Sequence, residues 1–142
     1  MSESSVRGML DTSTVILLGR IGDPASLPDE AVVSAVTLAE LSVGPHVARS
    51  ADERAARQAH LQQAEADFET IAFDGDAARV FGTVAASLRA SSRKPAARAY
   101  DALIAASAIA HGLPLFTCNP HDFEAIPQLD VRSVPHPDRG EK

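Results

Sequence analysis

Tryptophan is absent from this 142-residue chain, and its aromatic residues are limited to one tyrosine and five phenylalanines. A core with so few aromatic side chains has to be built mainly from Ala, Val, Leu and Ile. Proteins that bind single-stranded nucleic acid without sequence preference stack the bases on aromatic side chains. The composition therefore argues against a binding module of that kind.

Cysteine occurs once, at Cys118. The chain can therefore form no internal disulfide, and it has no cluster of thiolates for zinc. Apolar runs long enough to span a membrane are also lacking, and the polar first residues do not resemble a signal peptide. We therefore expect a cytoplasmic protein with no membrane partner.

Basic residues are outnumbered, with 13 Lys and Arg against 19 Asp and Glu and a formal charge of −6. This sign is unfavourable for binding nucleic acid through its phosphates alone. It is compatible with a nuclease, because acids gathered around bound cations account for part of the negative charge. The length and the 45% hydrophobic content predict a single domain over 1–142, with a core at about 6–134 and a frayed tail at 135–142.

Short apolar segments alternate along the chain with longer helical patterns. The apolar segments are continuous, which is typical of strands buried on both faces of a parallel sheet. Thr37, with Glu40 three residues later, fits a capping box at a helix start, and Gly112 fits a helix end. The sequence therefore predicts an α/β fold, a three-layer α/β/α sandwich with a central parallel sheet. Strands are expected at about 6–10, 31–36, 70–73, 113–117 and 131–134, and helices at about 12–20, 39–47, 51–69, 75–90 and 99–111.

Three acids, Asp11, Glu40 and Asp101, stand among apolar or small residues that predict buried structure. A buried carboxylate loses its hydration, and a shared divalent cation compensates for that loss directly. Asp11 and the segments 37–40 and 117–122 follow predicted strands, and sites in parallel sheets form beyond the carboxyl ends of strands. Each acid alone has a simpler role as a cap or as a favourable charge at a helix N-terminus. Together they favour a metal site that hydrolyses a phosphodiester.

Four motifs in the chain resemble, in this order, those of the PIN domain, and most closely those of the VapC toxins of bacterial toxin–antitoxin pairs. The resemblance extends from about Val6 to Val134. It implies a PIN-like fold and an endoribonuclease that depends on Mg²⁺, with Mn²⁺ as a substitute. It also implies a homodimer that cuts transfer or ribosomal RNA and is inhibited by a small VapB-like antitoxin. The motifs are Leu10-Asp11-Thr12-Ser13, Thr37-Leu38-Ala39-Glu40-Leu41, Asp101 to Ala106 followed by His111 to Leu115, and Thr117 to Phe123.

The resemblance also implies roles for single residues. Asp11, Glu40 and Asp101 match the metal-binding acids of the family. Ser13 matches a small polar residue that steadies the site, and Thr117 matches a hydroxyl near it. The reaction implied is in-line attack of an activated water on RNA, which leaves 5′-phosphate and 3′-hydroxyl ends.

The fourth acid of the family has two candidates in this chain. Asn119 stands at the family's interval after Asp101, whereas Asp122 belongs to the adjoining Asn-x-x-Asp-Phe pattern. Either residue completes the catalytic set in this interpretation, and the two alternatives stay open.

Basic residues gather shortly before Asp101, at Arg93, Lys94 and Arg98. On an acidic protein such a cluster could guide the RNA backbone toward the metal. A solvated loop explains the same residues equally well.

Two other classes of protein compete with this interpretation. Asp11 ends a predicted strand, as the nucleophile of an aspartyl phosphatase or phosphotransferase does, but Ser13 stands where such enzymes need a second Asp. The other class is a catalytically weak PIN-fold binding module that only engages its antitoxin. Asn119, in the place of an acid, keeps that alternative open.

Overall fold

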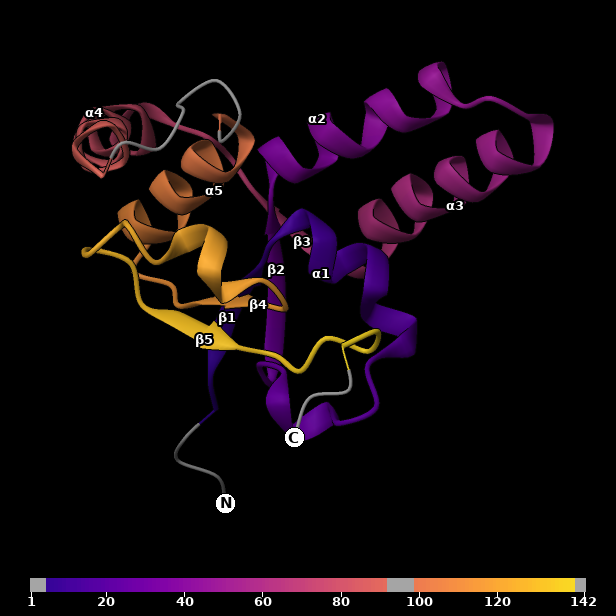
Figure 1. Cartoon of the computed structure of the whole chain (residues 1–142), viewed down its shortest axis with the longest axis horizontal. Helices are drawn as coiled ribbons and strands as arrows, with labels where there is room; N and C mark the ends of the chain where they lie inside the picture. Colours follow the sequence, from indigo (N-terminus) through magenta and orange to yellow (C-terminus); the bar gives the residue numbers. More distant parts are fainter. Residues whose placement is uncertain (1–4, 92–98, 140–142) are drawn as a thin grey trace.

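A sheet of five parallel strands lies at the centre of the computed structural model, which describes residues 5–91 and 99–139 (Figure 1). The strand order is β3-β2-β1-β4-β5. Each predicted strand is present, with its ends shifted by a few residues, so the expectation of a parallel sheet is confirmed. The strands are β1 (Arg7–Leu10), β2 (Glu30–Ser34), β3 (Glu69–Ile71), β4 (Leu115–Thr117) and β5 (Val131–Ser133).

Helices connect the strands and cover both faces of the sheet, which confirms the three-layer sandwich (Figure 1). In the described ranges, no helix combines the length and the apolar character needed to cross a lipid bilayer. The α-helices are α1 (Thr12–Leu17), α2 (Ala35–Val43), α3 (Ala51–Asp67), α4 (Gly75–Ala90) and α5 (Ala99–Ala110). Short 3-10 helices occur at η1 (Leu18–Arg20), η2 (Pro24–Ser26), η3 (Gly44–Val47) and η5 (Pro120–Phe123).

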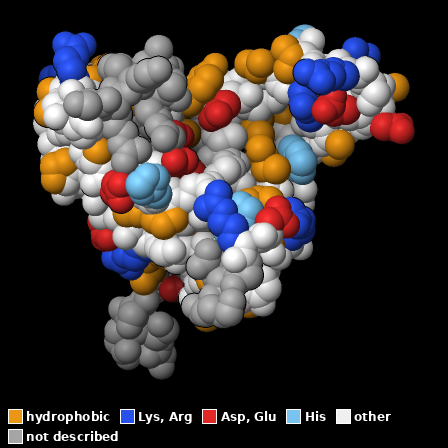
Figure 2. Space-filling view, viewed as in Figure 1, with side chains coloured by type: hydrophobic (Ala, Val, Ile, Leu, Met, Phe, Trp, Pro, Cys, Tyr) orange, Lys and Arg blue, Asp and Glu red, His pale blue; other side chains and the backbone are white. Residues whose placement is uncertain are grey.

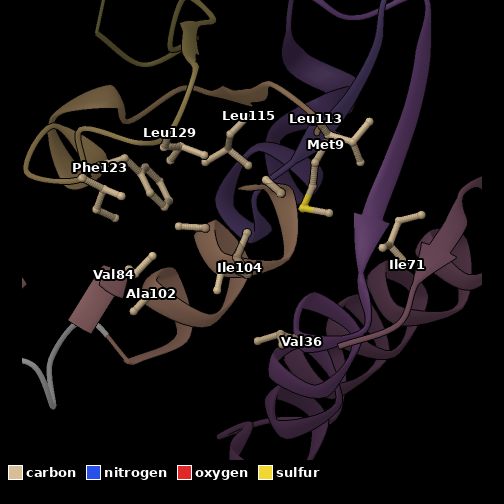
Figure 3. Close-up of a cluster of buried hydrophobic side chains, with 14 of the residues drawn as sticks. Met9, Val36, Ile71, Val84, Ala102, Ile104, Leu113, Leu115, Phe123 and Leu129 are labelled. Atoms are coloured by element: carbon tan, nitrogen blue, oxygen red, sulfur yellow. The ribbon is translucent and has the colours of Figure 1, made fainter. Parts of the chain in front are cut away.

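The core consists of two buried clusters, because successive residues of a strand point to opposite faces of the sheet. Met9 packs in one cluster with Val84 of α4 and Ile104 of α5 (Figure 3). Leu10, the next residue, packs in the other cluster with Ala64 of α3. Both faces of β1 are therefore buried, which explains why this segment is apolar throughout rather than alternating.

Helix α2 begins earlier than the sequence predicts. Ser34 is its N-cap, and the Ser34 hydroxyl accepts a hydrogen bond of 3.0 Å from the N–H of Val36. The predicted capping box at Thr37 is therefore wrong, because Thr37 lies inside the helix with its side chain fully buried. Glu40 has no capping role there, and its carboxylate contacts Thr12 instead.

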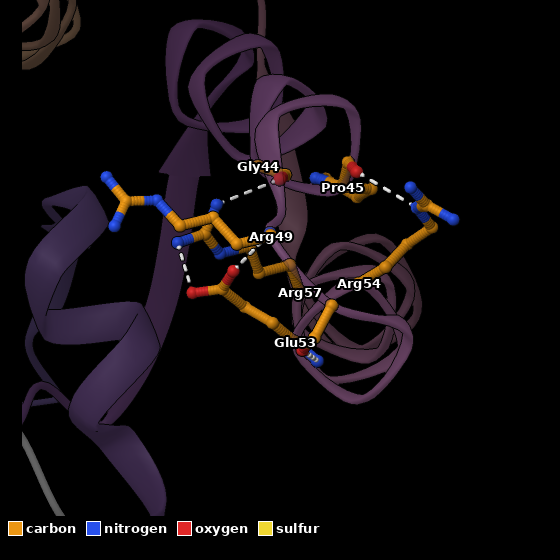
Figure 4. Close-up of polar contacts among 7 residues, drawn as sticks. Gly44, Pro45, Arg49, Glu53, Arg54 and Arg57 are labelled. Carbon is orange, nitrogen blue, oxygen red and sulfur yellow. Dashed lines mark hydrogen bonds and ion pairs between the residues drawn. The ribbon is translucent and has the colours of Figure 1, made fainter.

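Arginines of α3 form hydrogen bonds with η3, the segment that follows the end of α2 (Figure 4). Arg57 donates hydrogen bonds of 3.0 Å to the carbonyl of Gly44 and to the carboxylate of Glu53, and Arg54 donates one of 3.3 Å to the carbonyl of Pro45. Both carbonyls belong to η3, which directly follows α2. These bonds hold the helix that carries Glu40 against α3.

Helix α5 points its first turn toward the carboxyl ends of the strands. It ends at Ala110. Gly112 follows with a φ of 66°, which suits glycine, and the chain enters β4 only three residues after Gly112. Such a short connection makes the helix run antiparallel to the strand that follows it. Asp101, in the first turn of α5, therefore lies at the edge of the sheet where β1 and β2 end, and α5 contacts α2 there (Figure 1).

Candidate active site

Asp11 directly follows β1, and its side chain is 4% exposed. Its carboxylate accepts hydrogen bonds from the hydroxyls of Ser13 at 3.1 Å, Thr117 at 3.0 Å and Thr14. Burial raises the pKa of this carboxyl, and the three hydroxyls partly oppose the rise. Within the described part of the chain, Asp11 forms no ion pair with a lysine, arginine or histidine. It is therefore a buried carboxylate held by neutral groups alone.

The strand order reverses between β1 and β4, and Asp11 and Thr117 follow these two strands. Sites in open parallel sheets form at such a reversal. Asn119 joins the same group, because its side-chain amide donates to Ser13 at 2.9 Å and its backbone N–H donates to the Thr117 hydroxyl at 2.9 Å. Asp11, Ser13, Thr117 and Asn119, all predicted from the sequence, thus form one hydrogen-bonded group.

Glu40 is half-buried on α2 and reaches the first residue of α1. The Thr12 hydroxyl lies 2.7 Å from Oε1 of Glu40 and 3.1 Å from the Thr37 hydroxyl. A hydroxyl has one proton, and a carboxylate is the stronger acceptor, so Thr12 donates to Glu40 and Thr37 donates to Thr12. This chain of contacts fixes Glu40 beside the residue that follows Asp11.

Sequence reasoning missed three of these hydroxyls, those of Thr12, Thr14 and Thr37, as members of the site. All three side chains are buried. The sequence predicts Thr37 to be a helix cap, a role that suits threonine equally well. The pattern that could have revealed them is the run of three hydroxyl residues, Thr12-Ser13-Thr14, directly after an acid and before an apolar helix.

The remaining predicted residues lie at the same edge of the sheet or outside the described ranges. Asp101 is half-buried in the first turn of α5, and Asp122 is half-buried in η5. Arg93, Lys94 and Arg98, the predicted RNA-guiding residues, lie outside the described residues.

Among residues 5–91 and 99–139, no three His, Cys, Asp or Glu side chains are grouped so that they could hold a metal ion. The structure thus brings Asp11 together with Ser13, Thr117 and Asn119, and Glu40 together with Thr12, without a ready-made cage of three carboxylates. The donor chemistry nevertheless fits a hard divalent cation. Magnesium prefers oxygen ligands, keeps several waters, and is commonly bound through one or two carboxylates. A cation beside Asp11 would also offset the cost of burying its charge.

Comparison with known proteins finds a matching family and several relatives. The model of the PIN domain family matches residues 9–129. Ribonuclease VapC5 of Mycobacterium tuberculosis is 41% identical over 128 residues, which cover 89% of this chain and 92% of that protein. Ribonuclease VapC of Rickettsia bellii is 30% identical over 130 residues, which cover 89% of this chain and 96% of that protein.

Solved structures share the fold over nearly the whole chain. The crystal structure of VapBC-5 from Mycobacterium tuberculosis, a member of the VapBC family of toxin–antitoxin systems, matches with a TM-score of 0.72 and 36% identity, covering 91% of this chain and 99% of that one. The DNA-bound VapBC of Salmonella typhimurium matches with a TM-score of 0.67 and 25% identity, covering 90% and 98%.

Proposed function

The chain belongs to the PIN domain family, and we infer that it is a VapC-type endoribonuclease, the toxin of a toxin–antitoxin pair. The observation that carries this inference is the Asp11 carboxylate, buried at the reversal of strand order and held by hydrogen bonds from neutral groups. Relatives that are 41% and 30% identical over most of the chain are ribonucleases named VapC.

We propose that Asp11, Glu40 and Asp101 bind the Mg²⁺ ion, for which Mn²⁺ can substitute, and that Asn119 or Asp122 completes the site. The three acids lie at the carboxyl edge of the sheet, and the hard oxygen donors suit this ion. When bound, the ion supplies positive charge that activates water and stabilises the departing oxygen of an RNA phosphodiester.

The chain's own residues orient and preserve this arrangement. Ser13, Thr14 and Thr117 fix the rotamer of Asp11 through three hydrogen bonds. Thr12 does the same for Glu40. Such supporting contacts set how well the ligands are oriented, and their loss typically costs 10–100-fold in metal affinity or activity.

We propose that the partner is a VapB-like antitoxin and that it docks in a groove beside the active site. Two cavities of about 420 and 280 Å³ share Ile16 and His60 and lie between α1, α2 and α3. Ile16 is 42% exposed, and Leu18 and Phe68 add apolar surface. The smaller cavity reaches Glu40. An amphipathic helix of the antitoxin fits this groove, with a basic side chain placed against Glu40. Homodimerisation stays a prediction from the family resemblance.

The test of the proposed function is the chemistry of the RNA ends. Purified protein is incubated with transfer RNA and ribosomal RNA in Mg²⁺, in Mn²⁺ and in a chelator, and the ends are mapped by sequencing. We expect cuts that need the metal, leave 5′-phosphate and 3′-hydroxyl ends, and stop when the antitoxin is added. Cyclic phosphate ends, or equal cutting in the chelator, would contradict the proposed mechanism.

One observation favours a second candidate, a binding module with little catalysis. Asn119 donates its amide to Ser13, where an acid would instead supply a metal ligand. Tight binding to the antitoxin without cleavage of any cellular RNA in Mn²⁺ would support this second candidate.

A further inference from the structure

A separate cavity of about 280 Å³ adjoins the proposed active site at the carboxyl ends of β4 and β5. Its lining includes Asn119, Ser133 and Arg139. Asn119 belongs to both sites, because its side-chain amide donates to Ser13, which in turn donates to Asp11. The cavity is therefore two hydrogen bonds away from the buried carboxylate.

Arg139 is held at this cavity by contacts of the residues that precede it. Asp138 forms an ion pair with Arg20 of η1, and its N–H donates to Nδ1 of His136 at 3.0 Å. The N–H of Arg139 donates to the carbonyl of His136 at 3.2 Å. Part of the segment expected to be a frayed tail is thus attached to the body of the protein.

The guanidinium of Arg139 differs from those of most arginines in the described chain. It forms no ion pair there, whereas Arg7, Arg20, Arg57, Arg79 and Arg132 each contact a carboxylate. The charge of Arg139 also influences Cys118, which lines the cavity. Burial raises the pKa of the Cys118 thiol, and the positive charge of Arg139 partly opposes that rise. Figure 2 shows Lys, Arg and His side chains next to Asp and Glu in the middle of one face of the molecule.

The other polar groups of the lining determine what the cavity can bind. Ser133 and Asn119 offer a hydroxyl and an amide as hydrogen-bond donors. His121 also lines the cavity, and its Nδ1 lies 2.9 Å from Glu124. Asp122 contributes a carboxylate, so a bound anion has to lie closer to Arg139 than to Asp122. An arginine that forms no ion pair, beside neutral donors, suits a phosphate group, which guanidinium binds through charge-assisted hydrogen bonds.

We propose that this cavity binds a backbone phosphate of the RNA strand next to the cleaved bond, through Arg139 assisted by Ser133 and Asn119. The proposal rests on the proposed function, because it takes RNA as the substrate. It assigns a positioning role to Arg139, which contacts a phosphate that does not react. The arginine would hold the strand in register with Asp11.

The test measures binding apart from cleavage. Affinity for a fluorescent single-stranded oligoribonucleotide is determined in chelating buffer at several salt concentrations, for the wild type and for Arg139→Gln. Each phosphate contact on a single strand contributes about 0.7 to the slope of log affinity against log salt. We expect Arg139→Gln to reduce the slope by about 0.7 and to weaken binding roughly tenfold at low salt, while Arg139→Lys keeps the slope.

Arg79→Gln is the matched control. Arg79 is an exposed arginine of α4 paired with Asp76. The start of α4 lies beside the far end of α5, because Asp74 is 3.3 Å from His111. Removing this charge should leave the slope unchanged. Equal slopes for the wild type and Arg139→Gln, or no measurable RNA binding by the wild type, would overturn the proposal.

Two further measurements complete the test. The first distinguishes RNA phosphate from free phosphate, and the second distinguishes failure of this inference from failure of the proposed function. Binding of inorganic phosphate is measured at constant ionic strength; phosphate binding that is lost in Arg139→Gln, while added phosphate does not displace RNA from the wild type, would show a site for free phosphate and overturn the assignment to RNA. Cleavage in Mg²⁺ is measured on the same proteins. A wild type that binds RNA with the Arg139-dependent slope but never cuts supports this inference and contradicts the proposed function. RNA cleavage by the wild type, together with equal salt slopes for the wild type and Arg139→Gln, contradicts this inference but not the proposed function.

Discussion

The Thr117 hydroxyl donates a hydrogen bond of 3.0 Å to Oδ2 of Asp11, which lies 106 residues earlier in the chain. The two residues end neighbouring strands, β1 and β4, on either side of the point where the strand order reverses. Thr117 is fully buried and Asp11 nearly so, so little water competes for this bond. The fold therefore orients this buried carboxylate through a neutral donor, a contact that leaves its negative charge uncompensated.

Replacing Thr117 by valine removes this donor and keeps the shape of the side chain. We expect RNA cleavage and Mn²⁺ affinity to fall by about 10–100-fold, as for other residues that orient metal ligands. Thr117→Ser keeps the hydroxyl and should recover most of both. Steady-state cleavage and Mn²⁺ titration, with circular dichroism to check the fold, test this expectation. Full activity of the valine variant would show that Asp11 needs no such orientation.

The burial of Asp11 predicts how the stability of the folded protein depends on pH. Because burial raises the pKa of this carboxyl in the folded state, folding favours its protonated form. The stability that it contributes is present below its pKa in the unfolded chain and is lost as the pH rises through its pKa in the folded state. In metal-free buffer, Asp11→Asn should therefore melt at a higher temperature than the wild type at neutral pH, and the gap should narrow toward acidic pH.

Addition of Mg²⁺ should then raise the melting temperature of the wild type and leave that of Asp11→Asn unchanged, because a ligand of the folded state stabilises it. Melting curves between acidic and neutral pH, with and without the ion, measure both effects. A wild type that is more stable than Asp11→Asn at neutral pH without metal would show that its carboxylate is not destabilising.

The alternation of helices and strands was predictable because it depends on local apolar patterns, and the sequence carries these directly. The residue at which α2 begins was not predictable, because Ser34 and Thr37 are both good N-cap residues. The choice between them depends on where β2 leaves the sheet, and Ser34 is still paired with Ile71 of β3. The acids of the candidate site could be recognised from the sequence because their immediate neighbours are apolar. The roles of Thr12 and Thr14 could not, because the partners of these hydroxyls are set by contacts between distant segments.

Close packing on β1 makes Gly8 a sensitive position. A Cβ atom at Gly8 would lie 2.5 Å from Cε1 of Phe116, a buried side chain. We expect Gly8→Ala to lower the free energy of unfolding by about 1–3 kcal/mol, the usual cost of overpacking a core. Gly82→Ala is the matched control, because nothing lies within 4 Å of its Cβ position on α4. This change should stabilise the protein by roughly 1 kcal/mol. Urea unfolding of both variants tests the difference, and equal effects would contradict it.

The basic segment before α5 gives a prediction from the sequence alone. Reversing the charges of Arg93 and Lys94 should weaken RNA cleavage, with the effect growing as the salt concentration falls, because steering by charge is screened by salt. The melting temperature should change little. Equal cleavage by the Arg93→Glu, Lys94→Glu variant at low salt would discard a guiding role for this segment.

Binding of Mn²⁺ measured alongside RNA cleavage, on the same samples of wild type, Asp11→Asn and Asp101→Asn, tests the central claim most directly. Asp130→Asn is the control, an exposed acid paired with Arg132. We predict that the wild type and Asp130→Asn bind the ion and cut RNA, while the two site variants stay folded but lose both. Full cutting by Asp11→Asn in metal-replete buffer would contradict the account.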